Sequence, residues 1–184
     1  GVQEVYPVTQ MEQMKGKYKT IFFTSAYIPY EQMDKPSEKL VTTNIDLVSK
    51  AVKLFPNSRI VFTSSVAVYG SHSDCISELS GYQNPTLYGL SKLAGETIVR
   101  THSNYAIIRF SSLFGSNMNE NTIIPRFIRQ ATQNGEINIH GNGARLQNYL
   151  YVGDAAQICL KAAAETGNEI YLGTSDRSIS NVEL

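Results

Sequence analysis

Short apolar segments that favour β-strands alternate with helical segments along this chain, and the alternation predicts a parallel α/β sheet. Residues 19–25 (KTIFFTS), 59–64 (RIVFTS) and 105–110 (YAIIRF) are short, β-prone and not amphipathic, as strands buried on both faces are. Residues 37–54 and 86–102, which separate them, carry apolar residues at helical spacing. We therefore expect three central strands with helices packed against them.

The pattern changes after the third of these strands. Residues 123–134 and 153–165 are predicted to be helices, and residues 137–140, 147–152 and 169–173 to be short strands. The second half of the chain is therefore expected to begin a smaller lobe and then to return to the sheet.

The bulk composition excludes a partner chosen by charge alone. The 184 residues include 16 Lys and Arg against 16 Asp and Glu, so neither nucleic acid nor an anionic membrane is expected as a partner. No apolar run has the length of a membrane span, and there is no signal-peptide pattern. Cys75 and Cys159 match no metal-ligand spacing, so we expect free thiols, no metal site and a cytoplasmic location.

A tyrosine and a lysine, Tyr88 and Lys92, lie four residues apart in a predicted helix. This spacing places the phenol and the ammonium on one helical face. A cation beside a phenol favours the phenolate, so Lys92 is expected to lower the pKa of Tyr88 from about 10 toward the working range. Such a tyrosine can donate and accept a proton in catalysis. Ordinary surface packing explains the same spacing, so the pair alone does not decide.

Two serines, Ser64 and Ser65, stand where the second predicted strand ends. In open α/β sheets, ligands bind at the carboxyl ends of the strands. A serine hydroxyl there can hydrogen-bond both a substrate oxygen and the catalytic phenol. The alternative is that the serines satisfy backbone groups at the strand end, and this applies more to Ser64 than to Ser65.

Several motifs occur in a characteristic order around these residues. They are residues 64–70 (SSVAVYG), Pro85, Tyr88, Ser91-Lys92, Gly95-Glu96, Arg109 followed by residues 113–115 (LFG), and residues 141–154 (GNGARLQNYLYVGD), which are similar to GDGxQxRDFxYVxD. Together they resemble the extended short-chain dehydrogenase/reductase family, also called the NAD-dependent epimerase/dehydratases, and within it the nucleotide-sugar epimerases. The resemblance extends from about Lys19 to Leu184.

The resemblance implies a Rossmann-like doubly wound parallel sheet with part of a small C-terminal substrate lobe. The first βαβ segment of that fold is expected to be missing, because no GxxGxxG or GxGxxG turn occurs in the sequence. Residues 1–115 would be the remainder of the dinucleotide-binding domain, residues 116–150 the start of the substrate lobe, and residues 151–184 a return segment shared between the two. Residues 178–180 resemble the start of a further helix.

By the same resemblance, Tyr88 is the acid/base at a hydroxyl or carbonyl, Lys92 tunes it and hydrogen-bonds the nicotinamide ribose, and Ser65 orients the reacting oxygen. The hydride goes to or from the cofactor, which is expected to be NAD or NADP with a slight preference for NAD. Residues expected at the cofactor are Tyr88, Lys92, Ser64, Thr24, Ser25, Ala26, Asn44, Phe110 and Ser111, with core packing an equal alternative for Phe110.

The expected substrate is a nucleotide-activated sugar. Residues expected to bind it are Ser65, Ala67, Tyr88, Ser112, Arg145 and Gln147. Ser112 stands where many nucleotide-sugar enzymes have asparagine, and Gln147 where the motif has the arginine near the diphosphate. A glutamine cannot form a charged, forked contact to phosphate, so Arg145 is the alternative source of charge.

The residues after Ser65 bear on the type of reaction. Val66 and Ala67 follow it, whereas the family's sugar dehydratases and decarboxylases usually have an acidic residue there. Dehydration is therefore disfavoured, and epimerisation or keto/alcohol interconversion is expected. Two alternatives stay open, a reductase or dehydrogenase of a non-nucleotide alcohol or ketone and a non-catalytic dinucleotide-binding regulator. A homodimer is expected, because the family's four-helix contact uses the helices that correspond to residues 37–54 and 86–102.

Overall fold

The computed structural model describes residues 4–14, 16–30, 35–72 and 75–184. The chain divides into two compact units, Gly1–Arg109 with Cys159–Leu172, and Phe110–Ile158 with Gly173–Leu184. The first segment of the first unit ends at Arg109, whereas the predicted boundary of the dinucleotide-binding part is residue 115. The expected return segment, residues 151–184, contributes to both units.

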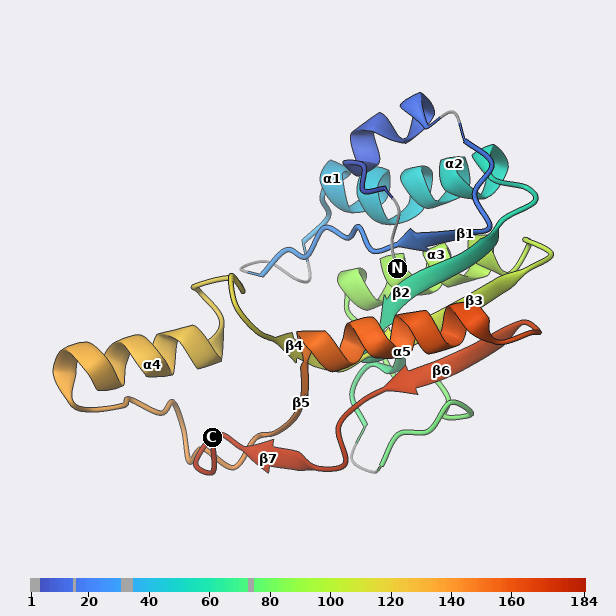
Figure 1. The fold of residues 1–184 in the computed structure, drawn as a ribbon. Helices are drawn as coiled ribbons and strands as arrows, with labels where there is room; N and C mark the ends of the chain where they lie inside the picture. The colour runs from blue at the N-terminus through green and yellow to red at the C-terminus, as the bar shows by residue number, and fades with distance from the viewer. Residues whose placement is uncertain (1–3, 15, 31–34, 73–74) are drawn as a thin grey trace. The chain divides into compact units, whose positions relative to one another are not determined.

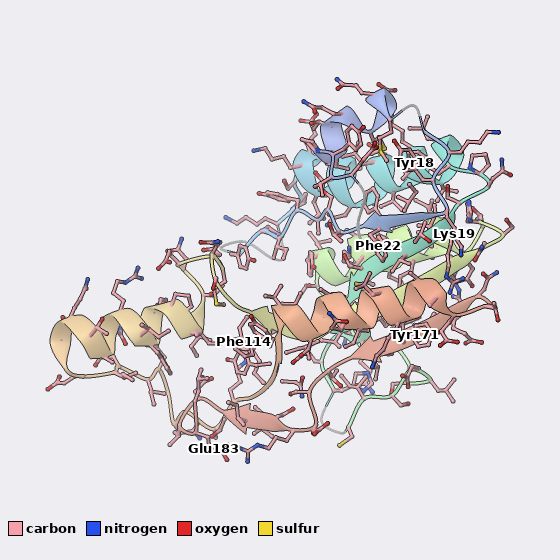
Figure 2. All side chains as sticks on the ribbon, viewed as in Figure 1. Tyr18, Lys19, Phe22, Phe114, Tyr171 and Glu183 are labelled. Carbon is pink, nitrogen blue, oxygen red and sulfur yellow. The ribbon has the colours of Figure 1, made fainter. Side chains whose placement is uncertain are left out.

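A four-stranded sheet forms the centre of the first unit, with the strand order β1-β2-β3-β6 (Figure 1). Its strands are β1 (Thr20–Phe23), β2 (Arg59–Ser65), β3 (Tyr105–Phe110) and β6 (Glu169–Gly173). Strands β1 and β2 pair in parallel, and the parallel central sheet confirms the predicted Rossmann-like α/β class. Phe22 on β1 and Tyr171 on β6 mark the two edge strands (Figure 2).

The helix predicted for residues 37–54 contains a local change of winding. It consists of α1 (Glu38–Val41), the π-helical turn η2 (Thr42–Asp46) and α2 (Leu47–Leu54). Single π-turns are rare and often occur at functional sites. This one carries Asn44, whose side chain is completely buried.

Helix α3 (Leu87–Val99) carries Tyr88 and Lys92 and begins at Thr86. The Thr86 hydroxyl accepts a hydrogen bond of 3.2 Å from the backbone N–H of Gly89, which caps the helix. A Cβ atom at Gly89 would collide with the carbonyl group of Ala67. The absent side chain therefore lets the first turn of α3 lie against the 3₁₀ helix η3 (Val66–Tyr69).

Side-chain alternation along β2 connects the core to the site. Ile60 and Phe62 belong to the apolar core that α2 and α3 cover, and Ser64 continues this row on the same face. The buried members of this core are Met11, Phe23, Val48, Ala51, Ile60, Phe62, Val99 and Ile107.

The second unit contains a three-stranded sheet in the order β4-β5-β7. Strand β5 (Leu146–Tyr151) pairs in parallel with β4 (Ser112–Phe114) and antiparallel with β7 (Ser178–Ser180). Helix α4 (Ile123–Asn134) belongs to this unit and α5 (Val152–Ala164) is divided between the two units; both occur where helices were predicted. Among the residues that the structure describes, no helix is long and apolar enough to cross a membrane.

Two local predictions for the second unit are wrong. Residues 178–180, which resemble a helix start, form β7, because Gln147 of β5 pairs with Ile179 and holds the segment extended. Residues 137–140 do not form a strand. Their two isoleucines, Ile137 and Ile139, are 45% and 37% exposed, so little apolar packing stabilises a strand there.

Candidate functional site

Ser65 and Tyr88 meet at the carboxyl end of β2. Ser65 is the last residue of the strand, and its hydroxyl accepts a hydrogen bond of 3.1 Å from the backbone N–H of Ala67. The same hydroxyl acts on the phenol of Tyr88 and favours its ionised form. Since Ala67 uses a lone pair of the Ser65 oxygen, the hydroxyl proton stays available for the phenol or for a ligand oxygen.

Lys92 lies one turn further along α3 and is only 1% exposed. Its ammonium donates a hydrogen bond of 2.7 Å to the backbone carbonyl of Thr63 and lies 4.3 Å from the centre of the Phe62 ring. Burial lowers the pKa of Lys92 to about 8, and the negative charge of Glu96 opposes this decrease. At neutral pH the ammonium is therefore charged, and Thr63 uses only one of its three N–H donors.

The predicted effect of Lys92 on Tyr88 is wrong for the structure as it stands. Burial raises the pKa of Tyr88 to about 12, and the neighbouring Ser65 hydroxyl offsets only part of this increase. The side chain of Tyr88 is buried, so its ionised form would lose most of its hydration. Lys92 shares the helical face of Tyr88 but donates to Thr63, so the phenol is held as a proton donor at neutral pH.

A buried ion pair lies beneath these residues. Arg109 of β3 donates two hydrogen bonds to the carboxylate of Glu96, from Nε to Oε1 at 2.9 Å and from Nη2 to Oε2 at 2.7 Å. Both side chains are 1% exposed. Ser64 completes the carboxylate environment with a hydrogen bond of 2.5 Å to Oε1. The hydroxyl of Ser64, an expected cofactor contact, is thus committed to the protein interior.

Arg109 also holds both ends of the loop between β2 and α3. Its Nη1 donates to the hydroxyl of Tyr69 at 2.7 Å, and its Nη2 donates to that of Tyr82 at 3.0 Å. Burial alone would lower the pKa of Arg109, but the bonds to Glu96 and Tyr69 outweigh it and the pKa is raised. The guanidinium therefore stays charged and fixes the loop that leads into Tyr88.

Asn44 connects the segment after β1 to helix α3. Its Oδ1 accepts from the backbone N–H of Tyr27 at 2.8 Å, and its Nδ2 donates to the Tyr27 carbonyl at 3.0 Å and to Ser91 Oγ at 2.9 Å. Both amide protons are thus used within the protein. Asn44 was expected at the cofactor. In the structure its side-chain amide holds this segment instead, and no amide proton is left for a cofactor.

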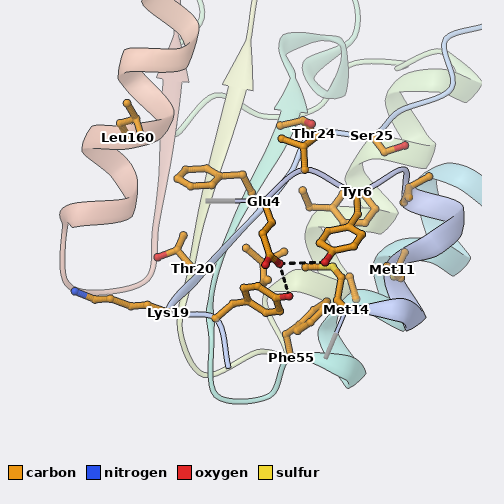
Figure 3. A pocket seen from close by; sticks show the side chains of 17 residues that line it. Glu4, Tyr6, Met11, Met14, Lys19, Thr20, Thr24, Ser25, Phe55 and Leu160 are labelled. Atoms are coloured by element: carbon orange, nitrogen blue, oxygen red, sulfur yellow. Dashed lines mark hydrogen bonds between the residues drawn. The ribbon is translucent and has the colours of Figure 1, made fainter. Parts of the chain in front are cut away.

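Thr24, Ser25 and Ala26 follow the carboxyl end of β1, as expected for residues near a cofactor. Thr24 and Ser25 also line a cavity of about 620 Å³ beside β1, shown in Figure 3. Most of its other walls are apolar, and Glu4 forms its polar end by accepting hydrogen bonds from two tyrosine hydroxyls. Residues Ser65, Tyr88 and Lys92 do not line it, so it is not the site of proton transfer.

The remaining expected site residues belong to the second unit. Phe110 is buried, and the hydroxyl of Ser111 is buried without a hydrogen-bond partner. Ser112 of β4 and Gln147 of β5 are hydrogen-bonded through their side chains. Arg145 is exposed and acts electrostatically on the Tyr149 phenol, lowering a pKa that burial raises. It lies two residues before Gln147, just before β5 begins.

The residues of the first unit fit the nicotinamide end of a dinucleotide. Lys92 keeps ammonium protons beyond the one that Thr63 uses, which suits ribose hydroxyls. The glycine-rich turn that would hold a pyrophosphate does not occur in the sequence. The fit is thus restricted to the end where the chemistry takes place.

The motifs did not predict roles for Tyr69, Tyr82 and Ser91. Tyr69 is the last residue of η3 and Tyr82 lies between η3 and α3, and their meeting at one guanidinium depends on the fold. Glu96 gave the only usable signal, because it lies four residues after Lys92 and hence on the same helical face.

Comparisons with known proteins agree with this arrangement. A sequence model of the NAD dependent epimerase/dehydratase family matches residues 22–172. The dTDP-D-glucose 4,6-dehydratase of Dictyostelium discoideum is 28% identical over 92% of this chain and 44% of its own length. The UDP-N-acetyl-alpha-D-glucosaminuronate decarboxylase of Bacillus cytotoxicus is 26% identical over 94% of this chain and 59% of its own length. This chain thus spans about half the length of these relatives.

A solved structure shows the same fold. The UDP-glucuronic acid 4-epimerase of Bacillus cereus, in complex with UDP-glucuronic acid and NAD, superposes with a TM-score of 0.79. The match covers 95% of this chain and 58% of the epimerase, at 18% sequence identity. At this identity the likeness extends to the fold alone.

Proposed function

The chain belongs to the NAD-dependent epimerase/dehydratase family, and on that premise we propose that it carries the proton-transfer residues of an NAD-dependent epimerase of a nucleotide-activated sugar. The observation that carries the proposal is the placement of Ser65, oriented by Ala67, near Tyr88 and the buried ammonium of Lys92 at the carboxyl end of β2. A regulator that only binds a dinucleotide has no use for this proton-handling arrangement.

In the proposed reaction, Tyr88 and Ser65 act on one oxygen of the sugar. The Tyr88 phenol first loses its proton to solvent; the phenolate then takes the proton of the sugar hydroxyl as that carbon is oxidised and returns it to the same oxygen on reduction. Ser65 is already oriented by Ala67 and holds the oxygen in place. Bound NAD supplies the hydride acceptor and donor for these two steps. Epimerisation results when the reduction takes place on the opposite face of the sugar.

Lys92 contributes a positive charge in a buried position that water reaches poorly. The phenolate of Tyr88 is costly in its buried position, as its raised pKa shows. An ammonium on the same helical face stabilises the phenolate when Tyr88 gives up its proton. The lowered pKa of Lys92, about 8, places the loss of this charge just above neutral pH.

Epimerisation is favoured over elimination by the two residues next to Ser65 in the chain. Elimination of water needs a further acid/base near the sugar, and Val66 and Ala67 cannot serve as one. Related dehydratases and a decarboxylase show that the family catalyses several reactions. The second candidate is a reductase or dehydrogenase of a non-nucleotide alcohol, which the neutral pair Ser112 and Gln147 would suit.

The substrate and cofactor assignments complete the proposal. We assign Ser112, Gln147 and Arg145 to the nucleotide sugar, together with Ala67, and prefer NAD because solved structures of the same fold hold it. A homodimer through α2 and α3 is part of the same proposal.

A panel of nucleotide sugars tests this function. The whole protein should be used, because the chain spans only about half of its matched relatives. With NAD and UDP- or dTDP-sugars, we expect an epimer by NMR and an increase in Tm with the true substrate. Formation of a 4-keto-6-deoxy sugar would show that the reaction is a dehydration and would contradict the assignment as an epimerase. If no nucleotide sugar is turned over and none raises Tm, the non-nucleotide reductase is favoured.

A further inference from the structure

The pair of Glu96 and Arg109 contacts each structural element around the candidate catalytic residues. Arg109 extends from β3, and Glu96 lies on α3 one turn after Lys92. Their hydrogen bonds extend to β2, to η3 and to the end of the next loop, through Ser64, Tyr69 and Tyr82. One ion pair therefore connects the segments that carry Ser65, Tyr88 and Lys92.

Stability alone is a weak reason for this arrangement. Removing two charges from water costs several kcal/mol per ion, and a well-packed apolar pair of similar volume is often as stable or more stable. Phe62, Ile107 and Val99 of the same layer show that the fold supplies apolar packing there. The charges of Glu96 and Arg109 thus call for a role beyond holding the core together.

The position of Glu96 indicates this role. Its carboxylate is the acidic group that acts on Lys92, and it lies on the same helical face. Glu96 forms no salt bridge with Lys92, since its oxygens are taken by Arg109 and Ser64. The carboxylate is therefore held at a fixed place, where it supports a positive charge without removing the ammonium from the site.

The other charged and titratable groups near Lys92 come from several elements. Tyr88 precedes it on α3, and Tyr30, from the segment after β1, acts electrostatically on Tyr88. Arg109 of β3 binds the carboxylate of Glu96 and the hydroxyl of Tyr69 in η3. Arg109 is positive, and burial raises the pKa values of Tyr69 and Tyr88, which keeps both phenols protonated at neutral pH. Only Glu96 in this group favours the charged form of Lys92.

We propose that Glu96, held between Ser64 and Arg109, is a positioning residue that keeps the Lys92 ammonium charged next to Tyr88. The role assigned to Lys92 rests on the proposed function, whereas the effect of Glu96 on its charge does not. Arg109 and Ser64 hold the carboxylate, and through Ser64 the same contact fixes the end of β2 that carries Ser65.

The test is a titration of the Lys92 side chain in the 184-residue chain. Lysine is labelled with ¹⁵N at Nζ, and the Lys92 signal is assigned from its loss in Lys92→Met. In Glu96→Gln, the midpoint of the Lys92 titration should fall by about half a unit or more, because a nearby opposite charge is removed. Glu165→Gln, the same change on an exposed residue, is the matched control and should leave the midpoint unchanged.

A second variant covers the case in which Glu96→Gln does not fold, since it leaves Arg109 buried without its partner. The double variant Glu96→Gln/Arg109→Met removes both charges and should still show a fall in the midpoint, smaller than in Glu96→Gln because the positive charge of Arg109 is lost as well. An unchanged midpoint in whichever variant folds would reduce Glu96 to a packing role. In the active whole protein, the alkaline limb of kcat/KM should move to lower pH in the same variants. A midpoint that falls while Tyr88→Phe stays fully active would leave the effect of Glu96 standing and remove the proposed function.

Discussion

The side-chain amide of Asn44 donates a hydrogen bond of 2.9 Å to Ser91 Oγ and thereby joins η2 to α3. Ser91 in turn donates to the backbone carbonyl of Tyr88 at 2.7 Å. The π-helical turn is thus connected through two hydrogen bonds to the backbone of Tyr88. This connection makes Asn44 a support of the site although it shares no side-chain contact with the phenol.

Asn44→Ala is expected to lower the free energy of unfolding by about 3 kcal/mol, because buried polar groups of Tyr27 and Ser91 lose their partners. Urea unfolding measures the effect. Asn57→Ala, the same change at an exposed position, should change stability by less than about 0.5 kcal/mol. Equal losses in the two variants would mean that the η2 contacts add nothing.

Tyr88→Phe is expected to reduce kcat of the whole protein by roughly 10²- to 10⁴-fold, because the proton donor and acceptor is removed. The affinity for NAD, measured by calorimetry, should stay nearly the same. Tyr171→Phe, on β6, removes a phenolic hydroxyl outside the site and should keep full activity. A Tyr88→Phe protein as active as the parent would contradict the assignment.

The buried ion pair should show strong coupling in a double-mutant cycle. Glu96→Gln and Arg109→Met each leave one buried charge unpaired, and each is expected to cost about 3–5 kcal/mol of stability. The double variant should cost less than the two losses together by about 1–3 kcal/mol. The exposed pair Lys50–Glu12, with a nitrogen–oxygen distance of 2.6 Å, is the comparison and should couple by less than about 1 kcal/mol. Additive losses at the buried pair would contradict its role as a unit.

Lys92 should make stability depend on pH in the alkaline range. Its pKa is about 8 in the folded chain and 10.5 when exposed, a difference that corresponds to roughly 3 kcal/mol. Below pH 8 both states are protonated and the burial cost is fully present. Between pH 8 and 10.5 the unfolded chain holds the extra proton, so the free energy of unfolding rises with pH.

Lys92→Met lacks this contribution, so its stability relative to the parent should be highest below pH 8 and should fall as the pH rises to 10.5. Urea unfolding at pH 7, 9 and 10 measures the difference. Lys53→Met, on the exposed side of α2, should show no such trend. A constant difference between Lys92→Met and the parent over this range would mean that Lys92 is not held at a lowered pKa.

The central strands were predictable because short, continuous apolar runs of β-prone residues are typical of strands that are buried on both faces. The errors fall on short segments whose structure depends on distant partners. Residues 178–180 are extended only because β5 pairs with them. Strand β4 is three residues long, too short to leave a pattern in the sequence. The π-helical turn is also invisible there, because its apolar spacing remains nearly helical.

The candidate site divides in the same way. Tyr88, Lys92 and Ser65 were predicted because their roles depend on local spacing and on the carboxyl end of one strand. The partnership of Glu96 with Arg109 depends on how α3 lies over β2 and β3, which no local pattern encodes. The pKa of Tyr88 was predicted with the wrong sign, since the sequence shows its neighbouring charge but not its degree of burial.

The contact between Gly89 and Ala67 has an evolutionary consequence. Any side chain at position 89 would meet a backbone carbonyl, which cannot move aside without displacing η3. Leu90, the next residue, is 46% exposed and has no such restriction. Selection should therefore remove variation at position 89 and permit it at position 90. An invariant glycine next to the reactive tyrosine would then reflect the lack of space for a side chain and not a part in the chemistry.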